Sequence, residues 1–277
     1  MPKEIDIIHE LDTFKDALFL HDDGYRFIKF HKTWRGFMKY GWASKALIGV
    51  GILFSLHFFS IIFDWISHVY EEGGNIVANT STMFIDLKEL VFLEGGIKYL
   101  ILICVEILIF HCSVKTINIL DGKERQPQLQ DFLAAEKRMI AVSFKCFIQE
   151  SIIAVVLGVL LNIVGLKPYL FLPMFLVHSY FIGFAFFDNY NEQYGFNIKE
   201  STKLVNERIG AVIGIGMVAV LLFKLPILGA IAAPMLGATT ATMYLYGEGL
   251  HWPTLPRLFH EDILKLKPMK EKIKLKA

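Results

Sequence analysis

Hydrophobic residues are gathered along the chain into six blocks, and each block is apolar at nearly every position. This pattern differs from the 3.6-residue repeat of a helix on a soluble protein, in which only one face is apolar. An α-helix needs about 20 apolar residues to cross the hydrocarbon core of a bilayer. The pattern therefore predicts an all-α integral membrane protein, with helices at about 46–65, 97–114, 151–166, 169–187, 209–223 and 227–246.

The last four blocks are expected to form two helical hairpins. Only Lys167 and Pro168 separate the third block from the fourth, and only Lys224, Leu225 and Pro226 separate the fifth from the sixth. The third and fifth blocks are short for a full crossing, so the hairpins either cross the bilayer or enter it part way. The predicted fold class is two long transmembrane helices plus these two hairpins.

The polar stretches divide the chain into an N-terminal segment (1–45), a membrane domain (46–246) and a basic tail (247–277). Within the membrane domain, residues 121–128 are rich in charged and turn-forming side chains and predict a linker. The linker separates the half with two long helices from the half with two hairpins. We do not expect the two halves to fold independently.

Two amphipathic helices are expected outside the blocks. In residues 5–20, one face carries Ile8, Leu11, Phe14 and Leu18, which indicates a short helix lying on the membrane or on the protein. A similar stretch at 129–147 is expected to run straight into the third block.

The positions of the basic residues indicate the topology. The 277 residues are 54% hydrophobic, with 28 Lys and Arg against 27 Asp and Glu, and this balance gives no indication of a nucleic-acid partner. If both termini are cytoplasmic, Lys88, Lys98, Lys167 and Lys224 are the only ones of the 28 basic residues on the outer side. Cytoplasmic loops of membrane proteins carry an excess of Lys and Arg, so this arrangement is the predicted one.

Two ionisable residues lie near the centres of the first two blocks. Antiparallel helices would bring His57 and Glu106 to a similar depth. Charged groups at such depth are costly and often functional, so one hypothesis is a proton-responsive His57–Glu106 pair. The alternative is a structural hydrogen bond between the two helices.

The hairpin turns each contain Lys followed by Pro, and proline suits the first turn of the returning helix. Such a turn presents unpaired N–H groups and the positive end of a helix dipole, so Lys167 and Lys224 are candidate anion-binding residues. The alternative is that both lysines reach the outer surface. Each returning helix is expected to be broken again, at Pro173 and at Pro234, and paired interruptions of this kind point to a transport site.

Small residues line the last two blocks. Gly210 and Gly214 form a GxxxG step, and Gly229, Ala233, Gly237 and Ala241 recur every four residues on one face. Such faces allow helix backbones to approach closely in a membrane. Close packing is the expected role, and a smooth face along a narrow path is the alternative.

The sequence lacks the patterns of soluble catalytic sites. It has no His-Glu-x-x-His, no phosphate-binding loop with Lys-Ser/Thr and no serine-nucleophile elbow. Cys104, Cys112 and Cys146 lack the spacing of metal ligands and are expected to pack. We therefore expect no enzyme activity, no metal and no cofactor.

Residues 181–246 contain a series of motifs with characteristic order and spacing. These motifs are Phe187-Asp188-x-Tyr190, Gly195-Phe196, Lys199-Glu200, Gly210 to Gly216, Pro226, Pro234 and Gly237-Ala238-Thr239. In these motifs the segment resembles the CysZ sulfate permease and etoposide-induced-protein family of membrane proteins. The first half matches only in outline, from Arg35-Gly36-Phe37 onward.

The resemblance implies a multi-pass protein of the bacterial inner membrane that conducts sulfate or a similar inorganic anion and forms homo-oligomers. It implies hairpins that enter the bilayer part way. Arg35, Lys39 and Lys45 would gather anions at the cytoplasmic mouth, and Lys45 keeps the charge of a family anion-binding motif. Asp188 and Glu200 are expected to hold the connector after the fourth block, and Asp188 is also a candidate cap for the next helix. Proton coupling is one option for the transport, and a non-transporting membrane scaffold is the alternative function.

Overall fold

The computed structural model describes residues 7–41, 45, 49, 97–122, 129–225 and 228–249, and all regular structure within them is helical. The first apolar block and His57 fall outside the described residues, apart from Gly49. The elements are α1 (Ile7–His31), η1 (Phe37–Tyr40), α4 (Ile97–Asp121), α5 (Leu129–Ile163), η2 (Lys167–Tyr169), α6 (Phe171–Gln193), α7 (Ile198–Asn206), α8 (Ile209–Phe223) and α9 (Leu228–Gly249).

Four helices of the described part are long and apolar enough to cross a membrane. A fifth span is obtained if α7 and α8, which meet at a bend of 97°, are counted as one. The predicted all-α class, with several helices long and apolar enough to span a membrane, is therefore confirmed for this part of the chain. The four candidate spans are Leu102–Asp121, Gln130–Ile163, Lys167–Gln193 and Leu228–Gly247.

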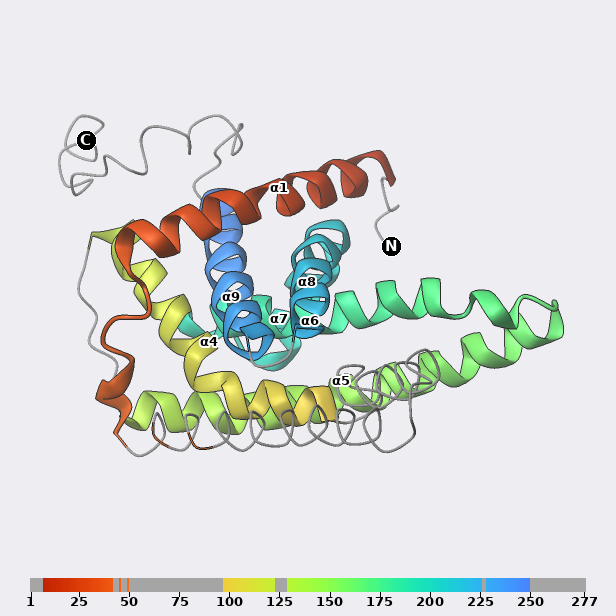
Figure 1. Cartoon of the computed structure of the whole chain (residues 1–277), viewed down its shortest axis with the longest axis horizontal. Helices are drawn as coiled ribbons and strands as arrows, with labels where there is room; N and C mark the ends of the chain where they lie inside the picture. The colour runs from red at the N-terminus through yellow and green to blue at the C-terminus, as the bar shows by residue number, and fades with distance from the viewer. Residues whose placement is uncertain are drawn as a thin grey trace, which may run out of the picture.

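Helices α4, α6, α8 and α9 form the centre of the molecule, and close crossings between them depend on glycine (Figure 1). A Cβ atom at Gly216 of α8 would lie 1.7 Å from the carbonyl oxygen of Ser179 in α6. A Cβ atom at Gly237 of α9 would lie 2.3 Å from the ring of Phe186. The predicted small-residue faces are thus packing faces, and the whole Gly229, Ala233, Gly237 and Ala241 face is buried.

Helix α1 lies across α8 and α9 (Figure 1). Gly210 and Gly214 face it, and a Cβ atom at Gly210 would lie 1.9 Å from the backbone oxygen of Glu10. Further along, Gly24 of α1 approaches Thr240 of α9. The N-terminal helix therefore packs against the GxxxG step of α8.

The predicted N-terminal helix is present, and the first part of its predicted apolar face is not covered by the bundle. Ile8 is 73% exposed and Leu11 53% exposed, whereas Ala17, Leu20 and Phe27 are buried. The helix also continues to His31 instead of ending near residue 20. It continues because Phe27 and Ile28 bury their side chains further along the helix.

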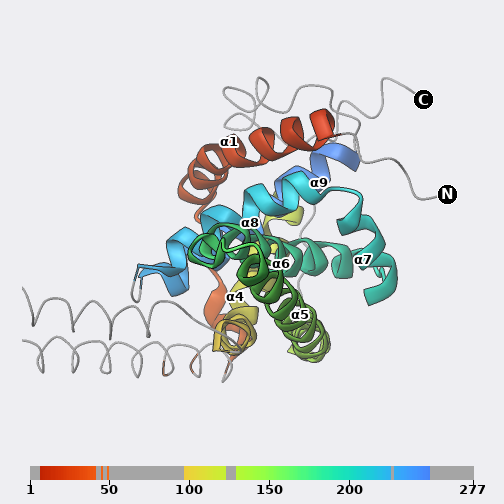
Figure 2. The same ribbon diagram turned by 90° about the vertical axis from the view of Figure 1, so that its right-hand side faces the viewer.

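Helices α5 and α6 form a hairpin whose far part projects from the centre, to the right in Figure 1 and toward the viewer in Figure 2. Little of the most apolar stretch of α5 is buried inside the molecule. Glu150 and Ser179 are buried, whereas the side chains of Phe171, Leu172 and Ile163 near the turn are exposed. This exposed surface is apolar, as expected for contact with lipid.

As predicted, residues 129–147 run straight into the third block, because Leu129–Ile163 is one continuous helix of 35 residues. The third block is therefore not a separate short span, and two further details of the predicted hairpins differ from the structure. Pro173 lies in the first turn of α6, where a backbone N–H would have no partner within the helix. Helix α9 runs unbroken through Pro234. The predicted breaks in the returning helices were therefore wrong. The fifth block is short, as predicted, because α8 has 15 residues.

Candidate functional site

A carboxylic acid is buried at the centre of the bundle. Glu106 of α4 is fully buried, and its Oε1 atom accepts a hydrogen bond of 2.6 Å from the Nδ2 of Asn189 in α6. Among the described residues, Glu106 Oε2 and Asn189 Oδ1 are buried without a hydrogen-bond partner. Buried polar atoms are normally paired with protein or water, so this position suits a bound water or a small polar solute.

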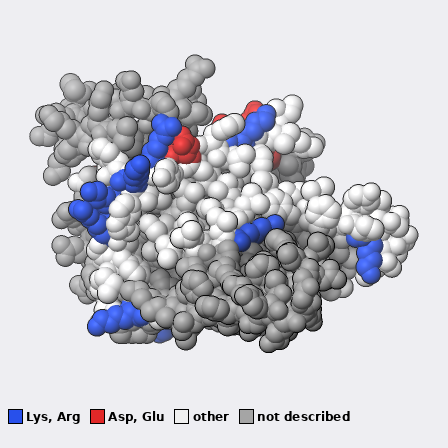
Figure 3. Space-filling model, viewed as in Figure 1, with Lys and Arg blue, Asp and Glu red and all other residues white. Residues whose placement is uncertain are grey.

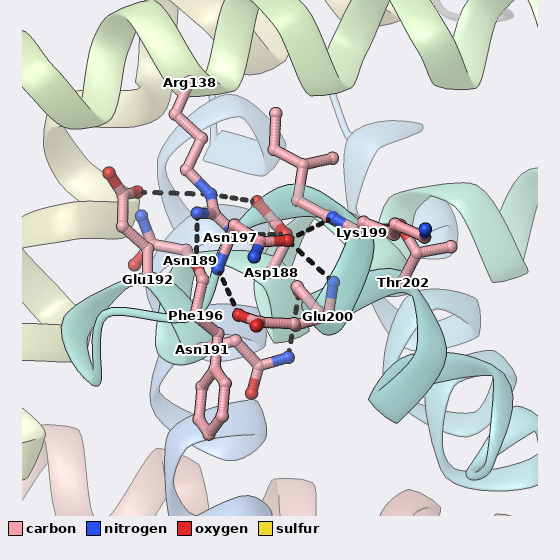
Figure 4. A network of polar contacts seen from close by, with 12 residues as sticks. Arg138, Asp188, Asn189, Asn191, Glu192, Phe196, Asn197, Lys199, Glu200 and Thr202 are labelled. Carbon is pink, nitrogen blue, oxygen red and sulfur yellow. Dashed lines mark hydrogen bonds and ion pairs between the residues drawn. The ribbon is translucent and has the colours of Figure 1, made fainter.

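The neighbouring residue on α6 forms an ion pair with α5. Asp188 accepts hydrogen bonds from Arg138 Nε at 2.9 Å and from Arg138 Nη2 at 2.8 Å (Figure 4). Nη1 of Arg138 donates to the backbone oxygen of Phe196, and Glu192 lies 3.9 Å from Nε. The guanidinium is therefore already occupied by groups of the protein. Arg138 thereby links Asp188 to Phe196 of the connector after α6.

The turn between α6 and α7 is stabilised by its own capping groups. Gly195 has φ of +80°, and the N–H groups of Gly195 and Phe196 donate to carbonyl oxygens of the last turn of α6, which is a Schellman cap. Asn197 accepts from the N–H of Glu200, and Glu200 accepts from the N–H of Asn197, forming a capping box (Figure 4). The N-cap of α7 is therefore Asn197. The prediction that Asp188 caps this helix was wrong.

Carboxylates outnumber the single arginine in this region. Glu136, Asp188 and Glu192 all interact electrostatically with Glu106, and Arg138 is bound to Asp188. Like charges in a low-dielectric interior repel strongly. A free anion would therefore be repelled here unless protons neutralise part of the carboxylates.

Buried hydroxyl groups add hydrogen-bonding capacity to the same bundle. On α4, Ser113 lies about two turns after Glu106 on the same side of the helix, and Thr116 lies about three turns after it, about 80° round the helix axis. A hydroxyl can donate to an anion and accept from a protonated acid or water. The buried hydroxyls without a partner among the described residues belong to Thr33, Ser113, Thr116, Ser143, Thr239, Thr240 and Thr242.

The two lysines of the hairpin turns are not brought together. Lys167 is exposed in η2, at the end of the projecting hairpin, whereas α8 and α9 lie near the middle of the molecule (Figure 1). Lys224 follows α8 and is half-buried. The N–H groups of Tyr169 and Leu170 donate within their own turn, so they are not open to an anion. The two turns therefore do not form one shared anion-binding site.

The remaining predicted residues are spread over the molecule. Arg35 and Lys45 are exposed, and Lys39 lies in η1. Pro226 falls outside the described residues. His57 also falls outside them, so the predicted His57–Glu106 pair is not described. Among the described residues, Glu106 accepts a hydrogen bond from Asn189.

A second acid–base pair was not predicted. His178 Nδ1 of α6 donates to Glu150 Oε1 of α5. Glu150 is buried close to the point where the α5–α6 hairpin leaves the bundle. His178 stands inside the fourth apolar block, and this placement was the signal that could have identified it. Its partner could not be inferred because Glu150 lies at the edge of the third block.

No family model, curated protein or solved structure matches the chain. The interpretation of the site therefore depends on the geometry above and on the sequence motifs in residues 181–246.

Proposed function

We propose that this protein is a membrane transporter or channel for a small inorganic anion, with sulfate as the first substrate to test, and that proton binding accompanies the passage. The observation that carries the proposal is the buried Glu106–Asn189 pair beside the Arg138–Asp188 pair, inside helices apolar enough to span a membrane. Ionisable groups within such helices are rare and commonly mark the path of an ion.

The charge of the site supports proton coupling. Asp188, Glu192 and Glu106 interact with one arginine that is already paired, so an anion enters this region favourably only when protons accompany it. Asn189 and the buried hydroxyls supply donors to the anion, while Arg138 keeps its place between α5 and α6. Lower pH should therefore increase anion flux.

The basic residues at the surface would act outside this site. Arg35, Lys39 and Lys45 would raise the local anion concentration at the cytoplasmic side, and Lys167 and Lys224 would do so separately on the outer side. The proposal includes residence in a bacterial inner membrane and assembly into homo-oligomers, both of which follow from the resemblance of residues 181–246.

Flux through proteoliposomes tests the proposal. Purified full-length protein is reconstituted, and uptake of radiolabelled sulfate is measured at several pH values with and without a pH gradient. We expect uptake that is faster at low pH and enhanced by an inward proton gradient. Glu106→Gln keeps the hydrogen-bond acceptor but cannot exchange a proton, so its flux should lose the pH dependence.

The matched control is Glu207→Gln, because Glu207 is exposed at the end of α7 and makes the same change of charge. Its flux should equal that of the unchanged protein. Uptake by Glu106→Gln with an unaltered pH profile would exclude the role of Glu106. Absence of flux for sulfate and other small anions, with correctly folded protein, would overturn the proposal and favour the scaffold function.

A further inference from the structure

The end of α1 and the turn after it combine basic and aromatic residues without any acid. No Asp or Glu occurs from Gly24 to Phe63. Basic and aromatic residues alternate through the first part of this stretch and continue toward the first apolar block. The basic residues are Arg26, Lys29, Lys32, Arg35, Lys39 and Lys45, and the aromatic residues up to position 42 are Tyr25, Phe27, Phe30, Trp34, Phe37, Tyr40 and Trp42.

The structure separates these residues into an inner and an outer set. Phe27 is 1% exposed, whereas Tyr25, Phe30 and Trp34 are 58%, 54% and 44% exposed. The side chains of Lys29, Lys32 and Arg35 are exposed as well. Figure 3 shows basic side chains gathered over the left end of α1. We call the six outer residues the headgroup surface, namely Tyr25, Lys29, Phe30, Lys32, Trp34 and Arg35.

The headgroup surface is fixed to the bundle from beneath. Phe27 and Ile28 bury their side chains, and the backbone oxygen of Thr33 accepts a hydrogen bond of 2.9 Å from His111 Nε2 of α4. Lys32 has φ of +50°, which ends the helix and turns the chain. The outer residues are therefore presented by a rigid backbone instead of a free tail.

We infer that the headgroup surface binds the anionic phospholipid headgroups of the membrane in which the protein resides. Three exposed aromatic rings beside three cations match the chemistry of this layer, because rings enter the boundary of the acyl chains while the cations contact phosphate. A surface that only collected free anions from water would gain nothing from exposed rings. The stretch also leads, within the chain, to the predicted first span at 46–65.

The inference goes beyond the proposed function, because it holds whether or not an anion passes through the bundle. Arg35 is common to both proposals, so the test changes Lys29 and Lys32 only. Arg26 is also left unchanged, since it is paired with Asp22 at 2.7 Å.

Fluorescence of Trp34 provides the test. Trp42, Trp65 and Trp252 are changed to Phe in the full chain, which leaves Trp34 as the sole tryptophan. The protein is placed in nanodiscs of phosphatidylcholine with or without phosphatidylglycerol, some with brominated acyl chains. We expect bromolipid quenching of Trp34, protection from aqueous iodide, and quenching at least about twofold stronger with phosphatidylglycerol at low salt.

The double variant Lys29→Gln/Lys32→Gln should lose the enhancement by phosphatidylglycerol. The matched control is Lys199→Gln/Lys203→Gln, because both of these lysines are exposed on α7. It should keep the enhancement.

Three results would overturn the inference. If iodide quenches Trp34 fully and bromolipids do not, the surface faces water. If neither quenches it, another protein surface, such as a second copy, covers it. If inorganic phosphate or sulfate shifts the Trp34 emission in detergent while phosphatidylglycerol has no effect in nanodiscs, the surface takes free anions instead of lipid.

Discussion

The carboxylate of Glu10 accepts a hydrogen bond of 2.5 Å from the backbone N–H of Gly210, although the two residues are 200 positions apart in the sequence. Gly210 lies in the first turn of α8, where N–H groups lack partners within the helix and the helix dipole is positive. A carboxylate at this position is therefore favourable. The contact joins the N-terminal helix to the C-terminal hairpin and fixes α1 across the bundle.

Gly210→Ala should detach this end of α1. The new methyl group would lie 1.9 Å from the backbone oxygen of Glu10, and a backbone atom cannot move aside without moving the helix. Overpacking of this kind costs about 1–3 kcal/mol. We expect a lower thermal unfolding midpoint in detergent and faster proteolysis within α1.

Gly158→Ala is the control for this prediction. Gly158 is also within a helix, but a Cβ atom there would meet nothing within 4 Å. Alanine favours the helix by up to about 1 kcal/mol, so this variant should be equally or more stable. Equal loss of stability in both variants would contradict the close packing of α1 on α8.

The stability of the α1 contact should fall at mildly acidic pH because of His21. His21 is buried, and its Nδ1 donates to the carbonyl oxygens of Ala17 and Leu18. Burial lowers the pKa of His21 below its ordinary value of 6.5, and these carbonyl bonds oppose the shift only in part. The folded state therefore resists a proton that the unfolded chain accepts. Stability is full above about pH 6.5 and is lost as pH falls toward the folded pKa, by at most about 1.4 kcal/mol per pH unit.

Unfolding midpoints at pH 5 and pH 8 measure this effect. His21→Gln should show a smaller difference between the two pH values than the unchanged protein. Part of the difference should remain, because burial also lowers the pKa of His31. His9→Gln is the matched substitution, since His9 is exposed on the same helix, and at pH 8 it should destabilise the protein less than His21→Gln does. If the unfolding midpoint of His21→Gln differs between pH 5 and pH 8 as much as that of the unchanged protein, His21 is not the cause.

Much of the fold was predictable because it depends on local composition. The fifth block was placed at 209–223, where α8 lies, and the four-residue spacing of Gly229, Ala233 and Gly237 indicated a packing face. The first prediction follows from the extent of the apolar block, and the second follows from helix periodicity. The ends of α1 were less predictable, because Asp22, Asp23 and Gly24 suggest a break that the packing of Gly24 on Thr240 removes.

Contacts between helices were not predictable in the same way. Periodicity assigns Asp188 to a position on α6 but does not indicate that α5 supplies its partner, 50 residues earlier. The same holds for Glu106, whose observed partner is Asn189. The sequence shows which residues are costly to bury alone, and only the arrangement of the helices shows how each is satisfied.

Asp188→Asn should destabilise the protein strongly. Arg138 would lose a carboxylate that accepts two hydrogen bonds, and its guanidinium is largely buried. Breaking a buried ion pair by changing one partner costs about 3–5 kcal/mol. We expect a large drop in the unfolding midpoint. Arg138→Lys should be destabilising as well, because an ammonium cannot form the paired bonds of the guanidinium.

Asp12→Asn is the control for the ion pair. Asp12 and Lys15 form an exposed pair at 3.6 Å, and exposed pairs contribute at most about 1 kcal/mol. The unfolding midpoint should hardly change. A small effect of Asp188→Asn, comparable to that of the control, would show that the Arg138–Asp188 pair does not hold α5 to α6.

The contact between Glu106 and Asn189 predicts opposite results for two substitutions of nearly equal size. Glu106→Gln keeps a carbonyl oxygen that can accept from Asn189 Nδ2, so the unfolding midpoint should be unchanged or raised. The midpoint is raised if the main effect of the substitution is to remove the repulsion of Glu106 by Glu136 and Glu192. Glu106→Leu leaves the buried amide of Asn189 without its acceptor, at a cost of about 1–3 kcal/mol. Asn189→Leu added to Glu106→Leu should restore part of that loss, because no unpaired amide then remains. If the double variant is instead as unstable as the sum of both single variants, the two side chains do not act as a pair.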